Sequence, residues 1–139
     1  PKPEEICLII AGHGTKRNLK SRKAIEAQVQ AIKELDEYAD VQSAFMEETP
    51  LIADCYENAG ARHIVMVPFF IADGLHTVED IPVLLGETEK QVKKRLEANQ
   101  VTWRNPTERK GKLVWYTEAI GSEPHLPEVI LERVREAAA

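Results

Sequence analysis

Short runs of β-forming residues alternate along this chain with longer stretches of helical periodicity. There are four such runs, which are Ile6 to Ala11, Val41 to Met46, His63 to Phe70 and Lys112 to Tyr116. This order is typical of βα units around a parallel sheet. The first run is apolar almost throughout, as a strand covered on both faces should be. We therefore predict an α/β fold, with a four-stranded parallel sheet in the order 2-1-3-4 and helices on both faces in a doubly wound arrangement.

Apolar spacing and capping residues predict the helices of the first half of the chain. A helix from about Leu19 to Tyr38 should carry an apolar stripe on the face that packs against the sheet. Thr49 and Pro50 form an N-cap and first-turn pair for a second helix, which Gly60 should end. The stripe of the first helix consists of Ile25, Val29, Ile32 and Leu35.

The second half of the chain carries similar signals. Thr77 is expected to cap a short helix that runs through Leu85, and Thr88 a charged helix over residues 89–98. Residues 99–111 have no apolar period, which predicts a surface loop. Ser122 is expected to cap a last helix. Its core-facing stripe should be Leu126, Val129, Ile130 and Val134.

Length and composition restrict the class of protein. The 139 residues suit one domain, which we place at residues 1–139, and the start at Pro1 without an initiator Met suggests a trimmed or excised piece. A net charge of −5 argues against nucleic-acid binding, which needs a basic face. No apolar run is long enough to cross a membrane. The two cysteines lie in apolar patterns that suit reduced thiols, so we expect a cytoplasmic protein.

Two glycine-containing loops that each carry a histidine follow neighbouring strands of the predicted sheet. His13 lies between Gly12 and Gly14 after the first strand, and His76 lies two residues after Gly74 beyond the third strand. In an open parallel sheet, ligands bind at the carboxyl ends of the strands, where the strand order reverses. The two imidazoles should therefore face one crevice, and the glycines would let a flat ligand approach the backbone. The alternative is a pair of tight turns with exposed histidines.

Acidic side chains near the same edge are further candidates. Glu47 and Glu48 end the second strand, where they either join the crevice or remain solvated. Asp73 and Asp80 either orient the imidazoles or serve as a loop residue and a first-turn acid of a helix. The other two histidines, His63 and His125, are expected to be solvated.

A basic cluster leads into the first predicted helix, where the helix dipole disfavours cations. Beside a crevice in an acidic protein, such a cluster suits a ligand with carboxylates or phosphates, and the alternative is a solvated helix start. The cluster consists of Lys16, Arg17, Lys20, Arg22 and Lys23.

Several motifs together resemble the small class II chelatases, the sirohydrochlorin cobaltochelatases, ferrochelatases and nickelochelatases of tetrapyrrole biosynthesis. The motifs are AGHGT at 11–15, VPFF at 67–70, GLHT at 74–77 followed by DIP at 80–82, and YTEAIG at 116–121. The resemblance implies that His13 and His76 bind the metal ion. It also implies a carboxylate at the end of the second strand, for which Glu47 is the match and Glu48 the alternative. A single lobe of this length resembles the short chelatases that dimerise, whereas larger chelatases contain two lobes, so the expected partner is a second copy or a second lobe.

The resemblance predicts a lyase that inserts a divalent metal ion into a tetrapyrrole, with Co²⁺ favoured over Fe²⁺ or Ni²⁺ and no organic cofactor. Two neutral imidazoles leave coordination positions open, so they can hold such an ion and release it. With an ordinary pKa near 6.5, an imidazole also accepts a proton near neutrality, as the departing pyrrole protons require. The catalytic residues are then His13, His76 and Glu47. Expected tetrapyrrole contacts are Gly12, Gly14, Thr15, Lys16, Arg17, Gly74 and Thr77.

Two alternatives belong to other classes. A non-catalytic carrier of the metal or the tetrapyrrole would need the same histidines. A histidine phosphatase also places a histidine after its first strand, in an RHG motif, but Gly12 stands where that arginine would clamp the phosphate.

Overall fold

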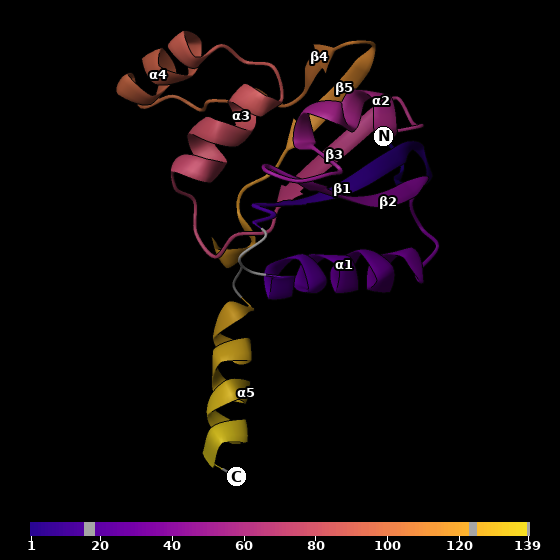
Figure 1. The fold of residues 1–139 in the computed structure, drawn as a ribbon, viewed down its shortest axis with the longest axis vertical. Coiled ribbons are helices and arrows are strands. Elements are labelled where there is room, and N and C mark those ends of the chain that lie inside the picture. Colours follow the sequence, from indigo (N-terminus) through magenta and orange to yellow (C-terminus); the bar gives the residue numbers. More distant parts are fainter. Residues whose placement is uncertain (16–18, 123–124, 139) are drawn as a thin grey trace.

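The computed structural model describes residues 1–15, 19–122 and 125–138, and its centre is a five-stranded sheet in the order β2-β1-β3-β5-β4 (Figure 1). Four strands are parallel, which confirms the α/β class and the predicted order 2-1-3-4. They are β1 (Ile6–Gly12), β2 (Asp40–Phe45), β3 (His63–Pro68) and β5 (Lys112–Tyr116). Pro68 is the last residue of β3, as expected because proline has no N–H to donate to a neighbouring strand.

A fifth strand was not predicted. Within residues 99–111, expected to be a loop, β4 (Thr107–Arg109) pairs antiparallel with β5 at the edge of the sheet. The two residues between these strands, Lys110 and Gly111, have φ of 52° and 77°. Positive φ at both positions suits the tight turns that join antiparallel strands. A three-residue strand is too short to show an apolar alternation, so only the turn residues signal it.

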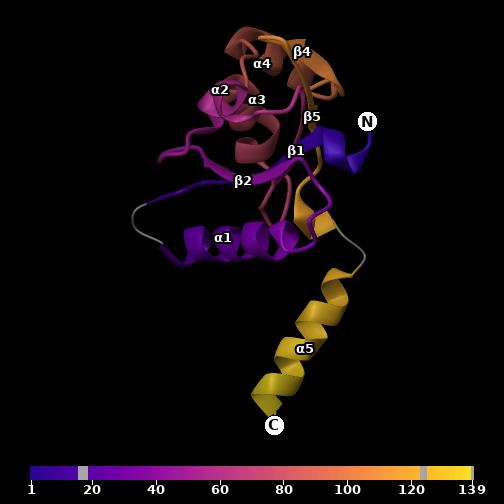
Figure 2. The ribbon, with the colours of Figure 1, turned by 90° about the vertical axis from the view of Figure 1, so that its right-hand side faces the viewer.

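Helices cover both faces of the sheet. On one face lies α1 (Leu19–Lys33), and on the other lie α2 (Cys55–Asn58), α3 (Ile81–Leu84) and α4 (Glu89–Glu97) (Figures 1 and 2). Thr88 caps α4 as predicted, since its hydroxyl accepts a hydrogen bond of 3.2 Å from the Gln91 N–H. Short helical turns complete the fold. They are η1 (Pro3–Glu5), η2 (Ile52–Asp54), η3 (His76–Asp80) and η4 (Ile120–Ser122).

Several predicted helix ends were wrong. The first helix stops at Lys33 rather than near Tyr38, because Asp36 has a left-handed φ of 52° that a helix excludes. The second begins after Leu51 without a side-chain cap, so Thr49 does not cap it, and it ends at Asn58 before Gly60.

The predicted core stripe of the last helix was also wrong. No residue of α5 (Leu126–Ala138) is buried, and Val129, Ile130 and Val134 are each about half exposed. Both views show α5 extending away from the sheet (Figures 1 and 2). Ser122 does not cap α5, because it ends η4, four residues before Leu126.

The core consists of two apolar layers, one on each face of the sheet. The layer beneath α1 includes Leu8, Ile10 and Ile25, and the opposite layer includes Ile9, Met66 and Val114. As predicted for a central strand, β1 is buried on both faces.

Both cysteines are buried free thiols, as expected. Burial raises the pKa of Cys7 to about 11 and that of Cys55 to about 12, so both remain protonated near neutrality. None of the helices in the described ranges is long and apolar enough to cross a membrane.

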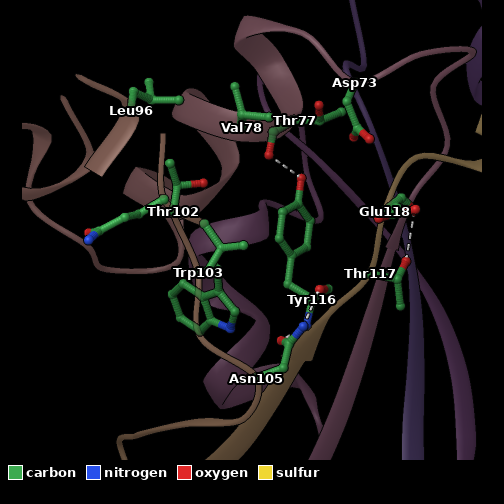
Figure 3. A pocket seen from close by; sticks show the side chains of 12 residues that line it. Asp73, Thr77, Val78, Leu96, Thr102, Trp103, Asn105, Tyr116, Thr117 and Glu118 are labelled. Carbon is green, nitrogen blue, oxygen red and sulfur yellow. Dashed lines mark hydrogen bonds between the residues drawn. The ribbon is translucent and has the colours of Figure 1, made fainter. Parts of the chain in front are cut away.

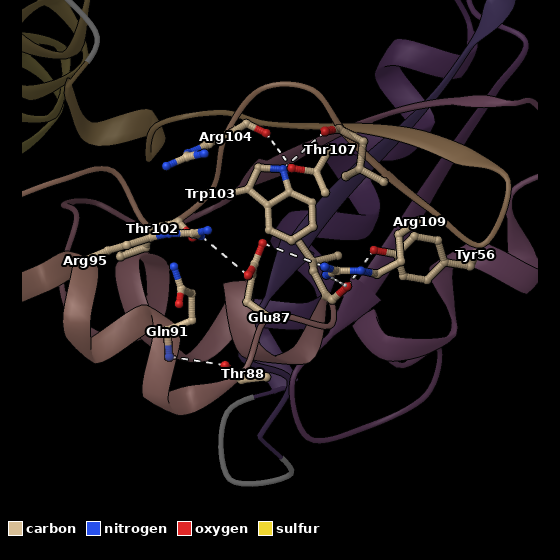
Figure 4. Close-up of polar contacts among 12 residues, drawn as sticks. Tyr56, Glu87, Thr88, Gln91, Arg95, Thr102, Trp103, Arg104, Thr107 and Arg109 are labelled. Atoms are coloured by element: carbon tan, nitrogen blue, oxygen red, sulfur yellow. Dashed lines mark hydrogen bonds and ion pairs between the residues drawn. The ribbon is translucent and has the colours of Figure 1, made fainter.

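A largely covered carboxylate ties α4 to the edge of the sheet (Figure 4). Glu87, only 11 % exposed, lies 3.4 Å from Arg95 Nη1 and 3.8 Å from Arg109 Nη2. Arg109 also donates to the Leu85 carbonyl and stacks over the Trp103 ring at 5.5 Å. Glu87 therefore offsets two cations that would otherwise be left largely desolvated.

Replacement of Glu87 by alanine should lower the free energy of unfolding by about 2 kcal/mol, because two partly buried guanidinium groups lose their counter-charge. Urea denaturation followed by circular dichroism measures the loss. The matched control is Glu57→Ala, which removes an exposed ion pair with Lys110 and should cost less than about 0.5 kcal/mol. Equal losses in the two variants would contradict the role of Glu87.

Candidate metal centre

Two histidines from separate loops meet at the carboxyl edge of the sheet. His13 directly follows β1, and His76 opens η3 after the loop that leaves β3. Their ring centroids lie 4.8 Å apart, with an angle of 42° between the ring planes. Their side chains are 33 % and 47 % exposed, so the pair is open to solvent. The structure thus brings together the two imidazoles that the strand order led us to expect in one crevice.

A carboxylate contacts each imidazole. Glu47 Oε1 lies 3.1 Å from His13 Nε2, and Asp80 Oδ2 lies 2.8 Å from His76 Nδ1. Of the two glutamates that sequence reasoning left open, Glu47 is the one beside the histidines. Glu48 instead points to Arg22, whose Nη1 lies 2.9 Å from Glu48 Oε1.

The hydrogen bond between Asp80 and His76 bears on which nitrogen of the His76 ring carries a lone pair. An ionised carboxylate only accepts hydrogen bonds, so the nitrogen that is bonded to it carries the proton. In a neutral His76 ring, the lone pair is then on Nε2. A carboxylate in this position also holds the ring and makes its other nitrogen a stronger ligand.

The pair offers few ligands, which limits what it can do. Across the described part of the chain, no three His, Cys, Asp or Glu side chains are grouped so that they could hold an ion together. Two imidazole nitrogens suit Co²⁺, Ni²⁺, Fe²⁺ or Zn²⁺ and leave most coordination positions open. Such a site favours an ion that exchanges over one that is held as a structural element.

The backbone around His13 is fixed by its contacts with the end of β2. Gly14 has φ of 73°, and a Cβ there would lie 2.5 Å from Phe45 Cβ, so only glycine fits. Gly12 is buried and has no positive φ, and a Cβ would collide with Ile25. The Glu47 N–H donates to the His13 carbonyl at 3.1 Å, which places Glu47 beside the ring.

The turn that carries His76 is fixed by buried hydrogen bonds. Thr77 is only 2 % exposed, and its hydroxyl accepts from the Gly74 N–H at 2.9 Å. Tyr116 donates its phenolic proton to the Thr77 carbonyl at 2.6 Å, and burial raises the pKa of Tyr116 (Figure 3). Thr77, expected to contact the ligand and to cap a helix, therefore holds the turn from inside. Gly74 has no positive φ, and a Cβ there would meet nothing within 4 Å.

The loop after β5 packs closely on the same turn. The Gly121 N–H donates to the Phe70 carbonyl at 3.2 Å, and a Cβ at Gly121 would overlap the backbone of Ile71. The Phe70 ring lies 6.0 Å from the His76 ring. Sequence reasoning assigned no role to Phe70 or Gly121, and the only signal for either was its place in a matched motif.

A cavity of about 310 Å³ opens behind the turn, between η3, β5 and residues 96–105 (Figure 3). Thr77, Tyr116 and Trp103 line it, and neither His13 nor His76 does. The histidine pair therefore lies on the open edge of the sheet, outside this cavity.

Other predicted site residues have structural partners. Asp73 Oδ1 accepts from the Ala119 N–H at 3.2 Å, so of the two aspartates only Asp80 orients an imidazole. His63 lies against the Trp115 ring at 5.8 Å, and His125 is exposed. Thr15, two residues after His13, is partly buried.

The basic cluster is divided in its roles. Arg22 contacts Glu26 at 2.8 Å and Glu48 at 2.9 Å, contacts that raise its pKa, so it belongs to the local structure. Lys20 and Lys23 are exposed on the first turns of α1. Lys16 and Arg17 lie outside the described residues.

Replacement of Asp80 by asparagine should weaken Co²⁺ binding about 10-fold to 100-fold, because the ring of His76 loses the acceptor that fixes its tautomer. Titration of the ion into the protein, followed by calorimetry, measures the change. Asp73→Asn is the control with the same chemical change, and its affinity should stay within about twofold of the original. Equal weakening in both variants would mean that Asp80 has no special role at His76.

Comparisons with known proteins agree with this geometry. A family model described as CbiX matches residues 7–137. A probable sirohydrochlorin cobaltochelatase from Halobacterium salinarum is 37 % identical over 136 residues, which cover 98 % of this chain and 44 % of that protein. A sirohydrochlorin cobaltochelatase from Methanopyrus kandleri is 30 % identical over 140 residues, which cover 95 % of this chain and 96 % of that protein. The chain thus spans less than half of the first relative and nearly all of the second.

Solved structures share the fold. A multi-domain protein from Deinococcus radiodurans, described as structurally similar to chelatases, superposes with a TM-score of 0.78 at 19 % identity over 96 % of this chain and 28 % of its own. The sirohydrochlorin chelatase SirB from Bacillus subtilis, solved in complex with cobalt, gives 0.64 at 19 % identity over 95 % of this chain and 50 % of its own. The arrangement of strands and helices is therefore that of the chelatases.

Proposed function

This chain belongs to the CbiX family, and from that premise we propose that it inserts a divalent metal ion into sirohydrochlorin or a closely related tetrapyrrole. The observation that carries the proposal is the pair of imidazoles 4.8 Å apart at the open edge of the sheet. Relatives that bear the name sirohydrochlorin cobaltochelatase support this substrate and favour Co²⁺ as the ion, with Fe²⁺ or Ni²⁺ as alternatives.

In the proposed reaction, the metal ion and the tetrapyrrole are both substrates. His76, through Nε2, and His13 hold the ion weakly, so that it can pass to the four nitrogens of the macrocycle. Two pyrrole N–H protons must leave as the ion enters, and an imidazole that has released the ion can accept one. Open coordination and basic nitrogens thus serve successive steps at the same two rings.

The carboxylates have a positioning role in this scheme. Asp80 holds the ring of His76 in the tautomer that directs its lone pair away from the carboxylate, and Glu47 lies beside the ring of His13. When a ring takes up a proton, the carboxylate beside it also stabilises the resulting imidazolium. Glu47, predicted as a catalytic residue, thus acts through His13.

The tetrapyrrole would lie against the open edge beside the loop of His13. Sirohydrochlorin carries carboxylates at its periphery, and exposed cations at the start of α1, Lys20 and Lys23, lie next to that loop in the sequence. Lys16 and Arg17 stay a prediction as further carboxylate contacts, together with the backbone of Gly12, Gly14 and Thr15. The cytoplasmic location and the homodimer, or a second lobe in a longer chain, also stay predictions.

Replacement of either histidine by alanine should reduce turnover at least about 100-fold, because each ring serves both metal transfer and proton acceptance. The measurement is anaerobic incubation of sirohydrochlorin with Co²⁺, Fe²⁺ or Ni²⁺, with the visible spectrum followed over many equivalents of substrate per protein chain. His125→Ala, at an exposed histidine away from the pair, is the control and should keep full turnover. If His13→Ala and His76→Ala both retained full turnover, the proposal would fail.

The same assay separates the alternatives. A non-catalytic carrier would bind the ion or the tetrapyrrole in one equivalent and would not metallate an excess. A histidine phosphatase would release phosphate from p-nitrophenyl phosphate, which we do not expect because Gly12 supplies no guanidinium.

Charge reversal of Lys16 and Arg17 together should raise KM for the tetrapyrrole about 10-fold and leave kcat nearly unchanged, because the change removes attraction to peripheral carboxylates and leaves the imidazoles intact. Steady-state kinetics at two ionic strengths measures this, and the effect should shrink in high salt. The control is the double reversal of Lys33 and Lys90, which are exposed on α1 and α4 far from the loop in sequence. An unchanged KM in the first variant would remove Lys16 and Arg17 from the substrate site.

A further inference from the structure

The turn that carries His76 interrupts the regular hydrogen bonding of a helix. In an α-helix, the Thr77 carbonyl would accept from the N–H of Ile81, four residues later. Here the Ile81 N–H donates to the His76 carbonyl instead, as in a π-helical turn. The next residue is Pro82, which has no N–H to donate. Neither of the two donors that could continue the helical pattern therefore reaches the Thr77 carbonyl.

A side chain from the sheet satisfies this carbonyl instead. Tyr116, the last residue of β5, donates its hydroxyl to the Thr77 carbonyl at 2.6 Å and is only 8 % exposed. A buried carbonyl without a donor would destabilise the backbone that carries it, so this bond favours the observed turn. His76 directly precedes Thr77, and Asp80 ends the same turn. The bond thus holds the backbone from which both of these side chains project.

Asn105 in turn holds Tyr116 by its backbone. Asn105 Oδ1 accepts from the Tyr116 N–H at 2.7 Å, and Asn105 Nδ2 donates to the Tyr116 carbonyl at 2.8 Å. The side-chain amide bonds to Tyr116 as the backbone of a neighbouring strand would, beyond the end of the pairing between β4 and β5. Figure 3 shows Tyr116 between Asn105 and Thr77, with a hydrogen bond at each end. A chain of hydrogen bonds therefore runs from the edge of the sheet to the turn of His76.

We propose that Tyr116 is a positioning residue for His76, and that Asn105 acts on His76 through Tyr116. Tyr116 and Thr77 both line the cavity of about 310 Å³, so without the hydroxyl the Thr77 carbonyl can bond to water there and the turn can move. A displacement of about 1 Å is enough to disturb a reacting geometry. The inference rests on the proposed function for its kinetic test, whereas ion binding tests it without turnover.

The first test is Co²⁺ affinity, measured by calorimetry. Tyr116→Phe removes the hydroxyl and keeps the ring in the core, and it should weaken Co²⁺ binding about 10-fold because His76 and Asp80 are no longer held. Tyr56→Phe is the matched control, since Tyr56 is 6 % exposed and donates to the Leu85 carbonyl, also at 2.6 Å. Urea denaturation should show similar losses of stability in both variants, and Tyr56→Phe should keep the affinity of the parent chain. Unchanged affinity in Tyr116→Phe, or equal weakening in both variants, would overturn the proposal.

The second test is turnover, which separates this inference from the proposed function. In the anaerobic assay with sirohydrochlorin and Co²⁺, Tyr116→Phe should lower kcat about 10-fold and leave KM for the tetrapyrrole within about twofold. The hydroxyl acts on an imidazole and not on the groups that attract the peripheral carboxylates. Full kcat in the variant of an active parent chain would overturn the positioning role alone. A parent chain without turnover would overturn the proposed function, and weaker Co²⁺ binding by Tyr116→Phe would still support the positioning role.

A double-mutant cycle tests whether Asn105 acts through Tyr116. Asn105→Ala alone should weaken Co²⁺ binding about threefold, and it should add little to the effect of Tyr116→Phe when both substitutions are combined. Gln100→Ala is the control, because Gln100 is exposed and lines the same cavity. It should bind Co²⁺ as the parent chain does. Additive losses in the Asn105→Ala, Tyr116→Phe chain would overturn the role of Asn105.

Discussion

Parallel pairing between β1 and β3 is the constraint on which the site depends. The end of β1 at Gly12 and the start of β3 at His63 are 51 residues apart in sequence. Even so, Ala11 pairs with Pro68, and the Phe69 N–H donates to the Ala11 carbonyl at 2.7 Å. Because both strands run in the same direction, the loops that follow them leave the sheet at one edge. His13 and His76 meet there as a consequence of the sheet, before any contact between their own side chains contributes.

The loops turn this edge into a chemical site through buried backbone contacts. Gly14 lets the chain pass against Phe45, and Thr77 with Tyr116 holds the turn that presents His76. The rings themselves remain partly exposed, so the buried part of the site is its backbone. The carboxylate of Asp80 then selects the nitrogen of His76 that faces outward, and Glu47 lies beside the ring of His13. Weak ligation by two imidazoles is compatible with an ion that must leave, whereas a closed tetrahedral set of ligands would hold it.

The features that the sequence predicts well are those determined by long apolar patterns. The run from Ile6 to Ala11 identified a central strand, and the strand order followed from the alternation of βα units. Local capping signals were less reliable, because a threonine hydroxyl can bond elsewhere in its own loop. The Thr77 hydroxyl accepts from the Gly74 N–H, and Thr49 does not cap the second helix. Thr88 caps α4 as expected. The contact of Asp80 with His76 joins two exposed side chains one helical turn apart, so spacing permitted it without favouring it over solvent.

The last helix shows what an apolar pattern leaves undetermined. The residues of α5 are apolar at helical spacing, but periodicity specifies only a face of the helix and says nothing about whether any surface covers it. The same holds for β3, where Val65 and Val67 are only partly buried although they pack against the layer beneath α1. How deeply such residues are buried is decided by the elements that pack on them, and those elements are set by the rest of the fold.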